Sequence, residues 1–180
     1  MKKLYLLSLL CLLVLAVCLL IGCDKETNCN CECECGGGIS MGYVDLGLPS
    51  GTKWKNMNET NADDDYDFYT YDEAVRVFGD SLPNYKQFRE LLTYCTWTWQ
   101  DNGYDNGYKV TGPNGNYIFL PALGYRLCDT TVHAVKVNGI YWSSTIYDTD
   151  CGWSLTFYSE YHTISYDRCC SGFSVRLVQN

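Results

Sequence analysis

The chain is poor in basic side chains and does not cluster them anywhere. Its 180 residues include 13 Lys and Arg against 21 Asp and Glu, which gives a formal net charge of -8 at pH 7. Proteins that bind nucleic acid need a basic patch or stripe, and an acidic surface repels phosphate backbones. The composition therefore excludes a nucleic-acid partner.

Histidine is also scarce, which limits both catalysis and metal binding. The two copies are His133 and His162, and neither lies close in sequence to Cys95. No neighbouring base is therefore available to activate that thiol as a nucleophile. Cys95 instead completes an i, i+3, i+4, i+7 pattern, which predicts a buried thiol on a helix face. The other members of this pattern are Phe88, Leu91 and Leu92.

One long apolar run stands at the start of the chain. Lys2 and Lys3 precede it, Leu4 to Ile21 form it, and small Gly22 follows. These are the parts of a secretory signal peptide. The tetrapeptide Leu20 to Cys23 resembles the bacterial lipobox, whose cysteine is acylated and becomes the new amino terminus. We therefore predict a lipoprotein signal peptide over residues 1–22, with acyl chains such as palmitate on Cys23.

The alternative is an uncleaved anchor helix, because the apolar run is nearly long enough to cross a bilayer. An anchor helix leaves the Gly22-Cys23 junction and the polar Asp24 to Glu26 unexplained. Several acyl chains hold a protein at a membrane firmly, so we expect a lipid-anchored protein of the bacterial cell envelope, at the outer membrane surface. Loss of the two signal lysines changes the formal charge by two, from -8 to -10.

Cysteine is abundant after the signal, and one group of it alternates with polar residues. Cys29 to Cys35 read Cys-Asn-Cys-Glu-Cys-Glu-Cys and run into three glycines. Soft thiolates select zinc or copper, so a metal cluster is one interpretation. Without a histidine or a second cluster, we favour a flexible tether over residues 23–41. Of the 12 cysteines, two leave with the signal and one carries lipid, so nine remain and cannot all pair within one chain.

Residues 42–180 have the length and composition of one folded domain. Thr70 with Glu73, and Asn84 with Gln87, have the form of capping boxes and predict the starts of two helices. Beyond residue 96, Asn-Gly turn signals separate short segments, which predicts β-structure. Residues 153–158 and 173–178 alternate in polarity and predict two half-buried strands, with the odd-numbered positions facing the core.

The stretch from Asn58 to Asp67 is polar and acidic, and we predict a solvated loop there. Asp63, Asp64, Asp65 and Asp67 offer the oxygen ligands that calcium prefers. The regular ligand spacing and the turn glycine of an EF-hand loop are missing, however. We therefore expect neither a metal nor a cofactor in this domain.

Several segments together resemble the Fibrobacter succinogenes major paralogous domain family, in order and over most of residues 42–179. The resemblance implies an α+β domain of the C-type-lectin-like fold, close to formylglycine-generating-enzyme-like domains. Such a domain has two helices, mixed antiparallel β-sheets and a pairing of the first and last strands. The segments that carry the resemblance are Tyr43 to Gly51, Leu82-Pro83, Leu91-Leu92, Cys95 to Trp99, Ile118 to Ala122, Gly124 to Arg126, Tyr141 to Thr145 and Gly172 to Arg176.

Between Ile146 and Phe173, residues typical of recognition surfaces separate framework positions such as Trp142, Gly152 and Gly172. Tyrosine gives a large rigid contact area, and Ser, Thr and Asp give adaptable hydrogen bonds. We predict that this face binds an extracellular protein or glycan. The candidate ligand-binding residues are Tyr147, Asp148, Asp150, Cys151, Ser154, Thr156, Tyr158, Tyr161, His162, Tyr166, Asp167, Cys169, Cys170 and Phe173.

The same stretch is similar to the variable region of proteins diversified by retroelements, which randomise asparagine codons. Adenine substitution in those codons can give Tyr, Asp, His, Ser, Cys, Ile, Thr and Phe, among others, but never Lys, Glu, Trp, Met or Gln. The positions that obey this limit are Ile146, Tyr147, Asp148, Thr149, Asp150, Cys151, Tyr161, His162, Thr163, Tyr166, Asp167, Cys169, Cys170 and Phe173. Diversification of this face is therefore a hypothesis beside plain ligand binding.

Two other functions compete with binding. A structural or adhesin role in the envelope is the first. The second is an enzyme, with Cys169-Cys170 and His162 for redox or copper chemistry, or Asp148 and Asp150 as a glycosidase pair. Adjacent cysteines make at best a strained disulfide, and two carboxylates in a loop have no fixed separation. The sequence therefore favours a non-enzymatic binding protein.

Replacement of Cys23 tests the lipid anchor. In the Cys23→Ala variant we expect loss of processing or release from the membrane fraction, because the acylated sulfur is gone. Cys18→Ala, within the signal, is the matched control and should leave processing and fractionation unchanged. A Cys23→Ala protein that is still cleaved and membrane-bound contradicts the prediction.

Overall fold

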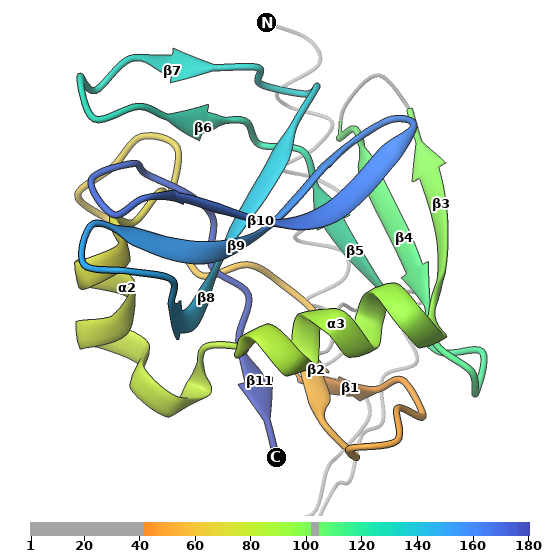
Figure 1. The fold of residues 1–180 in the computed structure, drawn as a ribbon. Coiled ribbons are helices and arrows are strands. Elements are labelled where there is room, and N and C mark those ends of the chain that lie inside the picture. The colour runs from red at the N-terminus through yellow and green to blue at the C-terminus, as the bar shows by residue number, and fades with distance from the viewer. Residues whose placement is uncertain (1–41, 102–104) are drawn as a thin grey trace, which may run out of the picture. The chain divides into compact units, whose positions relative to one another are not determined.

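The computed structural model describes residues 42–101 and 105–180, which form an α+β domain (Figure 1). In this part the helices are α2 (Tyr71–Phe78) and α3 (Tyr85–Tyr94), with the short 3-10 helix η1 (Gly79–Ser81) between them. None of the helices described is long and apolar enough to cross a membrane. The predicted signal peptide, the lipidated Cys23 and the tether lie outside the described residues.

The strands form antiparallel sheets, three of them three-stranded and one two-stranded among the described residues. The last strand pairs with the second strand, with Val178 opposite Trp54, and not with the first strand as the resemblance implies. The first strand pairs with the other side of the second, so the two ends of the domain still share one sheet. The sheets, in spatial order, are β1 (Tyr43–Asp45), β2 (Lys53–Lys55) and β11 (Val178–Gln179); β3 (Thr96–Gln100), β4 (Gly107–Thr111) and β5 (Tyr117–Pro121); β10 (Tyr161–Arg168), β9 (Cys151–Tyr158) and β8 (Gly139–Ile146); and β6 (Tyr125–Arg126) with β7 (Val132–His133).

Both predicted capping boxes are present at the helix starts. The Thr70 hydroxyl accepts from the Glu73 amide, and the Glu73 carboxylate accepts from the Thr70 amide at 2.9 Å. At α3, the Asn84 side chain accepts from the Gln87 amide at 3.1 Å, and the Gln87 side chain accepts from the Asn84 amide at 2.8 Å. Each box satisfies two amides that a helix start otherwise leaves unpaired, so the local sequence sets where both helices begin.

The β8–β10 sheet is packed on both faces. Tyr141 and Leu155 belong to the main core with α3, whereas the next residue along β8, Trp142, belongs to a second core with α2. Ser154 lies opposite Trp142 and is fully buried. The expectation that Ser154 points to solvent is therefore wrong, because α2 covers the face that alternation alone would assign to water.

The C-terminal segment is also more buried than predicted. Residues 171–178 are all buried, although the polarity alternation predicted a half-buried strand there. Phe173 is 1% exposed and stacks near Trp142 at 4.2 Å between ring centroids, so its predicted contact with a ligand is wrong. Before β11, isolated bridges pair this segment with its neighbours: Arg126 with Gly172, Tyr69 with Phe173, and Tyr141 with Ser174.

Arg176 is 1% exposed, and no carboxylate of the described residues lies within ion-pair distance of it. Its Nε donates to Asn58 Oδ1 at 2.9 Å, Nη1 to the Lys55 carbonyl at 2.9 Å, and Nη2 to the Phe119 carbonyl at 2.7 Å. Burial lowers the pKa of the guanidinium, yet arginine keeps its charge in proteins. The guanidinium fork thus ties β2, the segment after it and β5 to the C-terminal segment.

Tyr141 extends this network into β8. Its hydroxyl accepts from Asn58 Nδ2 at 3.1 Å and donates to the Pro121 carbonyl at 2.8 Å. Burial raises the pKa of Tyr141 to about 12, so the phenol keeps the proton that it donates. Asn58 therefore bridges the two largest buried polar side chains, Arg176 and Tyr141.

Removal of the guanidinium tests this network. Arg176→Met keeps most of the side-chain volume but leaves three buried acceptors unpaired, at about 1 to 3 kcal/mol each. We expect the free energy of unfolding to fall by at least about 3 kcal/mol in urea titrations. Arg168→Met, at an exposed position of β10, is the matched control and should change it by less than about 0.5 kcal/mol. Equal stabilities for the two variants contradict this account.

Candidate ligand-binding face

The loop between β8 and β9 is held in one conformation by its own polar groups. Asp148 Oδ1 accepts from the amides of Asp150 and Cys151, both at 2.9 Å. The Tyr147 amide donates to the Cys151 carbonyl at 2.9 Å. Gly152 follows directly, and a Cβ there would lie 2.4 Å from the ring of Tyr71, so only glycine fits beneath α2. Asp148 therefore shapes the loop that displays its neighbours.

Four aromatic side chains gather beside this loop. Tyr147 and Tyr166 stack with ring centroids 4.1 Å apart and planes 7° apart. Trp153 stands edge-on to both, and its other neighbour is Tyr85 at 4.8 Å. Tyr147 is 45% and Tyr166 51% exposed, so the cluster is half outside the core. We call Tyr85, Tyr147, Trp153 and Tyr166 the aromatic cluster.

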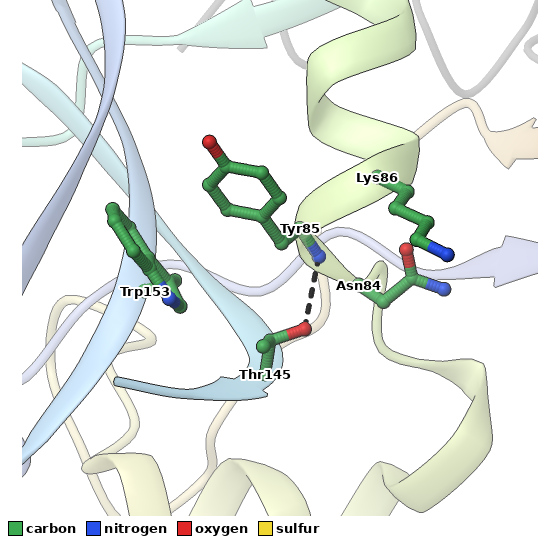
Figure 2. A pocket seen from close by; sticks show the side chains of 5 residues that line it. All are labelled: Asn84, Tyr85, Lys86, Thr145 and Trp153. Carbon is green, nitrogen blue, oxygen red and sulfur yellow. Dashed lines mark hydrogen bonds between the residues drawn. The ribbon is translucent and has the colours of Figure 1, made fainter. Parts of the chain in front are cut away.

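A cleft of about 390 Å³ opens beside Trp153 and the start of α3. Figure 2 shows the rings of Tyr85 and Trp153 on one side, with Thr145 below them and Asn84 and Lys86 beyond. Thr145 Oγ1 accepts from the Tyr85 amide at 3.0 Å, which fixes the helix start against β8. Binding sites commonly combine apolar and aromatic walls with a few polar groups, as this cleft does.

A second cavity, of about 460 Å³, lies on the other side of the loop. Its lining is mixed and charged, and most of it comes from the stretch predicted to be a recognition surface. The lining residues are Asp72, Ile146, Thr149, Asp150, Arg168, Cys169 and Cys170. The candidate residues Asp150, Cys169 and Cys170 are therefore brought together here.

The far end of the β9–β10 hairpin carries a separate aromatic pair. Tyr158 and Tyr161 face each other across the turn at 5.4 Å, and both are more than 40% exposed. Tyr158 lies five positions along β9 from Trp153, a distance of about 17 Å. The single patch predicted from the sequence is thus two patches, one at each end of the hairpin.

His162 and Thr156 are half-buried rather than outward. The His162 ring stacks on Trp97 at 4.6 Å between centroids and 7° between planes. Burial lowers the pKa of His162, which favours the neutral ring. This histidine therefore closes the edge of the main core, beside Tyr108 and Phe157.

The cysteines of the predicted face have different roles. Cys170 forms a disulfide with Cys128, 42 residues earlier, so the thiol expected to contact a ligand is already bonded. Cys95, Cys151 and Cys169 are free and half-buried. Burial raises the pKa of Cys95 and of Cys169 to about 11, so both are protonated at neutral pH and poor nucleophiles. The prediction of a buried thiol at Cys95 is consistent with its packing against the main core.

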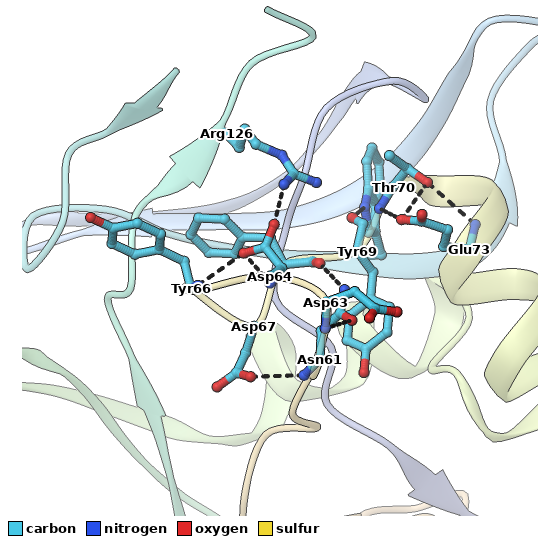
Figure 3. A network of polar contacts seen from close by, with 11 residues as sticks. Asn61, Asp63, Asp64, Tyr66, Asp67, Tyr69, Thr70, Glu73 and Arg126 are labelled. Atoms are coloured by element: carbon cyan, nitrogen blue, oxygen red, sulfur yellow. Dashed lines mark hydrogen bonds and ion pairs between the residues drawn. The ribbon is translucent and has the colours of Figure 1, made fainter. Parts of the chain in front are cut away.

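The acidic stretch is a loop in which Asp63 and Asp65 are exposed, as predicted, but Asp64 points into the protein. Figure 3 shows Asp64 between the loop backbone and Arg126. Its Oδ1 accepts from the Tyr66 amide at 2.9 Å, its Oδ2 pairs with Arg126, and its side chain is only 6% exposed. Within the residues that the structure describes, no three His, Cys, Asp or Glu side chains are placed to hold a metal ion. Asp64 serves as an internal turn-former and ion-pair partner.

Sequence reasoning missed the contribution of α3 to the cleft. Tyr85 and Asn84 were recognised only as the start of a helix, and Trp153 as a core residue, whereas Trp153 is half-buried at the cleft wall. One signal was available: Tyr85 sits at the first helical position, where a side chain points back past the helix start. The contact of Tyr85 with Trp153 of β9, 68 residues later, depends on tertiary structure and cannot be predicted from local sequence.

No family model, no curated protein and no solved structure matches the chain.

Asp167 makes the stability of this face depend on pH. It is half-buried, its carboxylate accepts from Ser154 Oγ at 2.6 Å, and burial raises its pKa. At acid pH Asp167 is protonated in both the folded and the unfolded chain, so it does not destabilise the fold. Once the pH rises through the raised pKa of the folded state, the buried carboxylate is charged and destabilises the fold. We expect Asp167→Asn to raise the melting temperature at pH 7 and to change it little at pH 3. A larger gain at pH 3 than at pH 7 contradicts this assignment.

Proposed function

We propose that this protein is a lipid-anchored protein of the bacterial cell surface that binds an extracellular protein or glycan through the β8–β10 face. The observation that carries the proposal is the aromatic cluster, half-exposed beside a cleft of about 390 Å³. Large aromatic rings displayed on a rigid support supply contact area at low entropic cost. Recognition sites concentrate their binding free energy in such residues.

The support beneath the cluster is rigid for identifiable reasons. Leu155 and Phe157 are fully buried under β9, and Trp142 is fully buried on the opposite face. The loop before β9 is bonded internally through Asp148. A ligand that meets Tyr147 or Trp153 therefore does not have to order the chain first, which favours affinity.

The fold that we propose is C-type-lectin-like, in the Fibrobacter succinogenes major paralogous domain family. The resemblance of the sequence motifs supports it, together with two helices, several antiparallel sheets and domain ends joined through β11 and β2. Framework residues named by that resemblance, Tyr141, Trp142 and Arg176, are fully buried or nearly so.

Diversification by a retroelement is the finer form of this proposal. Ile146, Tyr147, Thr149, Asp150, Tyr161 and Tyr166 are exposed, as positions that vary without loss of the fold need to be, whereas Asp148 is exposed but holds the loop through its side chain. Phe173 and Cys170 fit the codon limit but not the role, since one is buried and the other is disulfide-bonded. Sequencing of the neighbouring DNA tests the idea, which requires a reverse transcriptase gene and a near-copy of the 3′ coding region.

A structural or adhesin role is the second candidate, favoured by the exposed Tyr158–Tyr161 pair at the hairpin tip. An enzyme of the formylglycine-generating type has less support. Cys169 holds its proton because burial raises its pKa to about 11, and Cys170 is bonded to Cys128. Asp148 uses Oδ1 within its own loop. We therefore propose binding without catalysis.

Alanine substitutions separate binding from stability. Tyr147→Ala and Trp153→Ala should each weaken binding by about 2 kcal/mol or more, roughly thirtyfold, as central aromatic contacts do. The ligand is the one recovered from a surface-glycan array or from a bait screen of secreted proteins. Affinity is measured by titration calorimetry and stability by thermal melts.

Tyr94→Ala is the matched control, because Tyr94 is 51% exposed at the end of α3. It should change neither affinity nor melting temperature appreciably. If Tyr147→Ala and Trp153→Ala bind as tightly as Tyr94→Ala does, the ligand site lies elsewhere on the molecule.

A further inference from the structure

β10 is a long strand that is paired on one side only. All eight of its residues pair with β9 in unbroken register, and the spatial order β10-β9-β8 places it at the edge of the sheet. No strand in the described part of the chain pairs with its other side. The outer side of β10 therefore presents backbone groups that are free to bond with another chain.

In an antiparallel pair, alternate residues bond to the partner strand, so the pairing shows which backbone N–H and C=O groups of β10 point away from β9. Tyr158 and Tyr161 close a two-residue turn, so they exchange backbone bonds with each other. At the other end, the Cys169 amide donates to the Asp150 carbonyl at 2.8 Å. Both ends of the hairpin lead to the same assignment. The odd-numbered residues of β10 bond to β9, and the even-numbered residues direct their backbone N–H and C=O groups away from β9. The outward residues are His162, Ile164, Tyr166 and Arg168.

Few of these outward groups have protein partners. The Ile164 carbonyl accepts from Thr163 Oγ1 at 3.4 Å, and the Arg168 carbonyl accepts from the Ser171 amide at 2.9 Å. Within the described residues, the amides of all four outward positions and the carbonyls of His162 and Tyr166 have no backbone partner. Tyr166 and Arg168 are exposed, and Tyr166, which is 51% exposed, belongs to the aromatic cluster.

The edge has few of the features that usually protect such strands, and its charged residues, Asp167 and Arg168, lie together at its C-terminal end. β10 contains no proline, no lysine and no glycine, and its register with β9 has no bulge. Natural proteins blunt long edge strands with these devices, because an open edge pairs with other chains. An unpaired edge strand beside the half-exposed Tyr166 and the rest of the aromatic cluster suits the addition of a strand.

Charge indicates what kind of chain would add. Residues 146–170 contain four carboxylates and one arginine, so this stretch of the chain carries a net negative charge. The carboxylates are Asp148, Asp150, Glu160 and Asp167, and the arginine is Arg168. A second copy of the protein carries the same acidic charge and is repelled, whereas a basic chain is attracted. Side chains of an added strand would alternate between the Tyr166 side and the Asp167 side of the sheet.

We propose that the outer edge of β10 binds an extended, basic peptide segment as a fourth strand, with backbone bonds to the even-numbered residues and basic side chains beside Tyr166 or Asp167. This inference rests on the proposed function and names the ligand class for that face. Main-chain bonds supply affinity in such complexes, and the alternating side chains supply specificity. A basic side chain over an exposed tyrosine ring adds a cation–π contact.

The probe is a pool of octapeptides in which Lys or Arg alternates with Val, Thr or Tyr. The tightest binder to the full mature domain is remade as two isomers, N-methylated on either the odd or the even residues. Only one set of amides faces β10 in an added strand, so one isomer should bind as the parent does and the other at least about tenfold more weakly. Amide exchange of Ile164 and Tyr166 should slow in the complex.

Two variants test the same edge on the protein side. Tyr166→Ala removes the ring and keeps the amide, whereas Tyr166→Pro removes both, at an edge position where proline is tolerated. We expect Tyr166→Pro to bind the peptide at least about tenfold more weakly than Tyr166→Ala does, with both variants folded by circular dichroism.

The other possible outcomes each contradict one or both proposals. No binder from the pool, or two isomers that bind equally, overturns strand addition whatever the variants do. If a glycan or a folded protein binds and Tyr147→Ala weakens it, the proposed function stands and only the peptide edge fails. A peptide that binds with unchanged exchange at Ile164 and Tyr166, and equally to Tyr147→Ala, overturns both proposals. A shift to dimers on concentration, measured by sedimentation, identifies a second copy as the occupant.

Discussion

The buried guanidinium of Arg176 is the interaction on which the rest of the domain depends. Its three bonds reach β2, the segment after β2, and β5, and through Asn58 they reach Tyr141 in β8. Lys55 and Asn58 lie near the start of the domain, whereas Phe119, Tyr141 and Arg176 come from segments far from them and from one another in the sequence. A planar fork with fixed donor directions holds three acceptors at once, which a flexible ammonium group does less well. The position of the β8–β10 sheet follows from this anchor.

Once β8 is fixed, the binding face follows from packing on both sides of the sheet. Tyr141 packs into one core and Trp142 into the other, so β8 cannot shift by one residue without exposing one of them. β9 and β10 then extend from β8 and leave the aromatic cluster at one end. The exposed side chains contribute little to this arrangement, so they are free to serve recognition. Framework and surface are separated within a single hairpin.

The sequence predicts the parts of this structure that depend on local chemistry. Both capping boxes and the β-rich second half are readable because their signals lie within a few residues. Ser154 and Arg176 were expected to face solvent from their polarity, and both are buried because other elements cover them or supply acceptors. Two other features join residues that are distant in sequence, so no local pattern predicts them. They are the disulfide of Cys128 with Cys170 and the cleft beside Tyr85 and Trp153. The predicted lipid anchor falls outside the described residues and stays a prediction.

The central claim is that the buried framework residues fold the domain without help from the exposed residues of the binding face. A library in which these exposed residues are randomised tests it most directly. Residues 146, 147, 149, 150, 161 and 166 are randomised together to the residue types that asparagine-codon substitution allows, and each variant is scored for protease resistance. We predict that most variants stay folded, because all six positions are exposed and surface changes usually shift stability by less than about 0.5 kcal/mol. A parallel library at Tyr141, Trp142 and Arg176 should be almost entirely unfolded. If the two libraries lose folded members equally, the surface is part of the framework and the account is wrong.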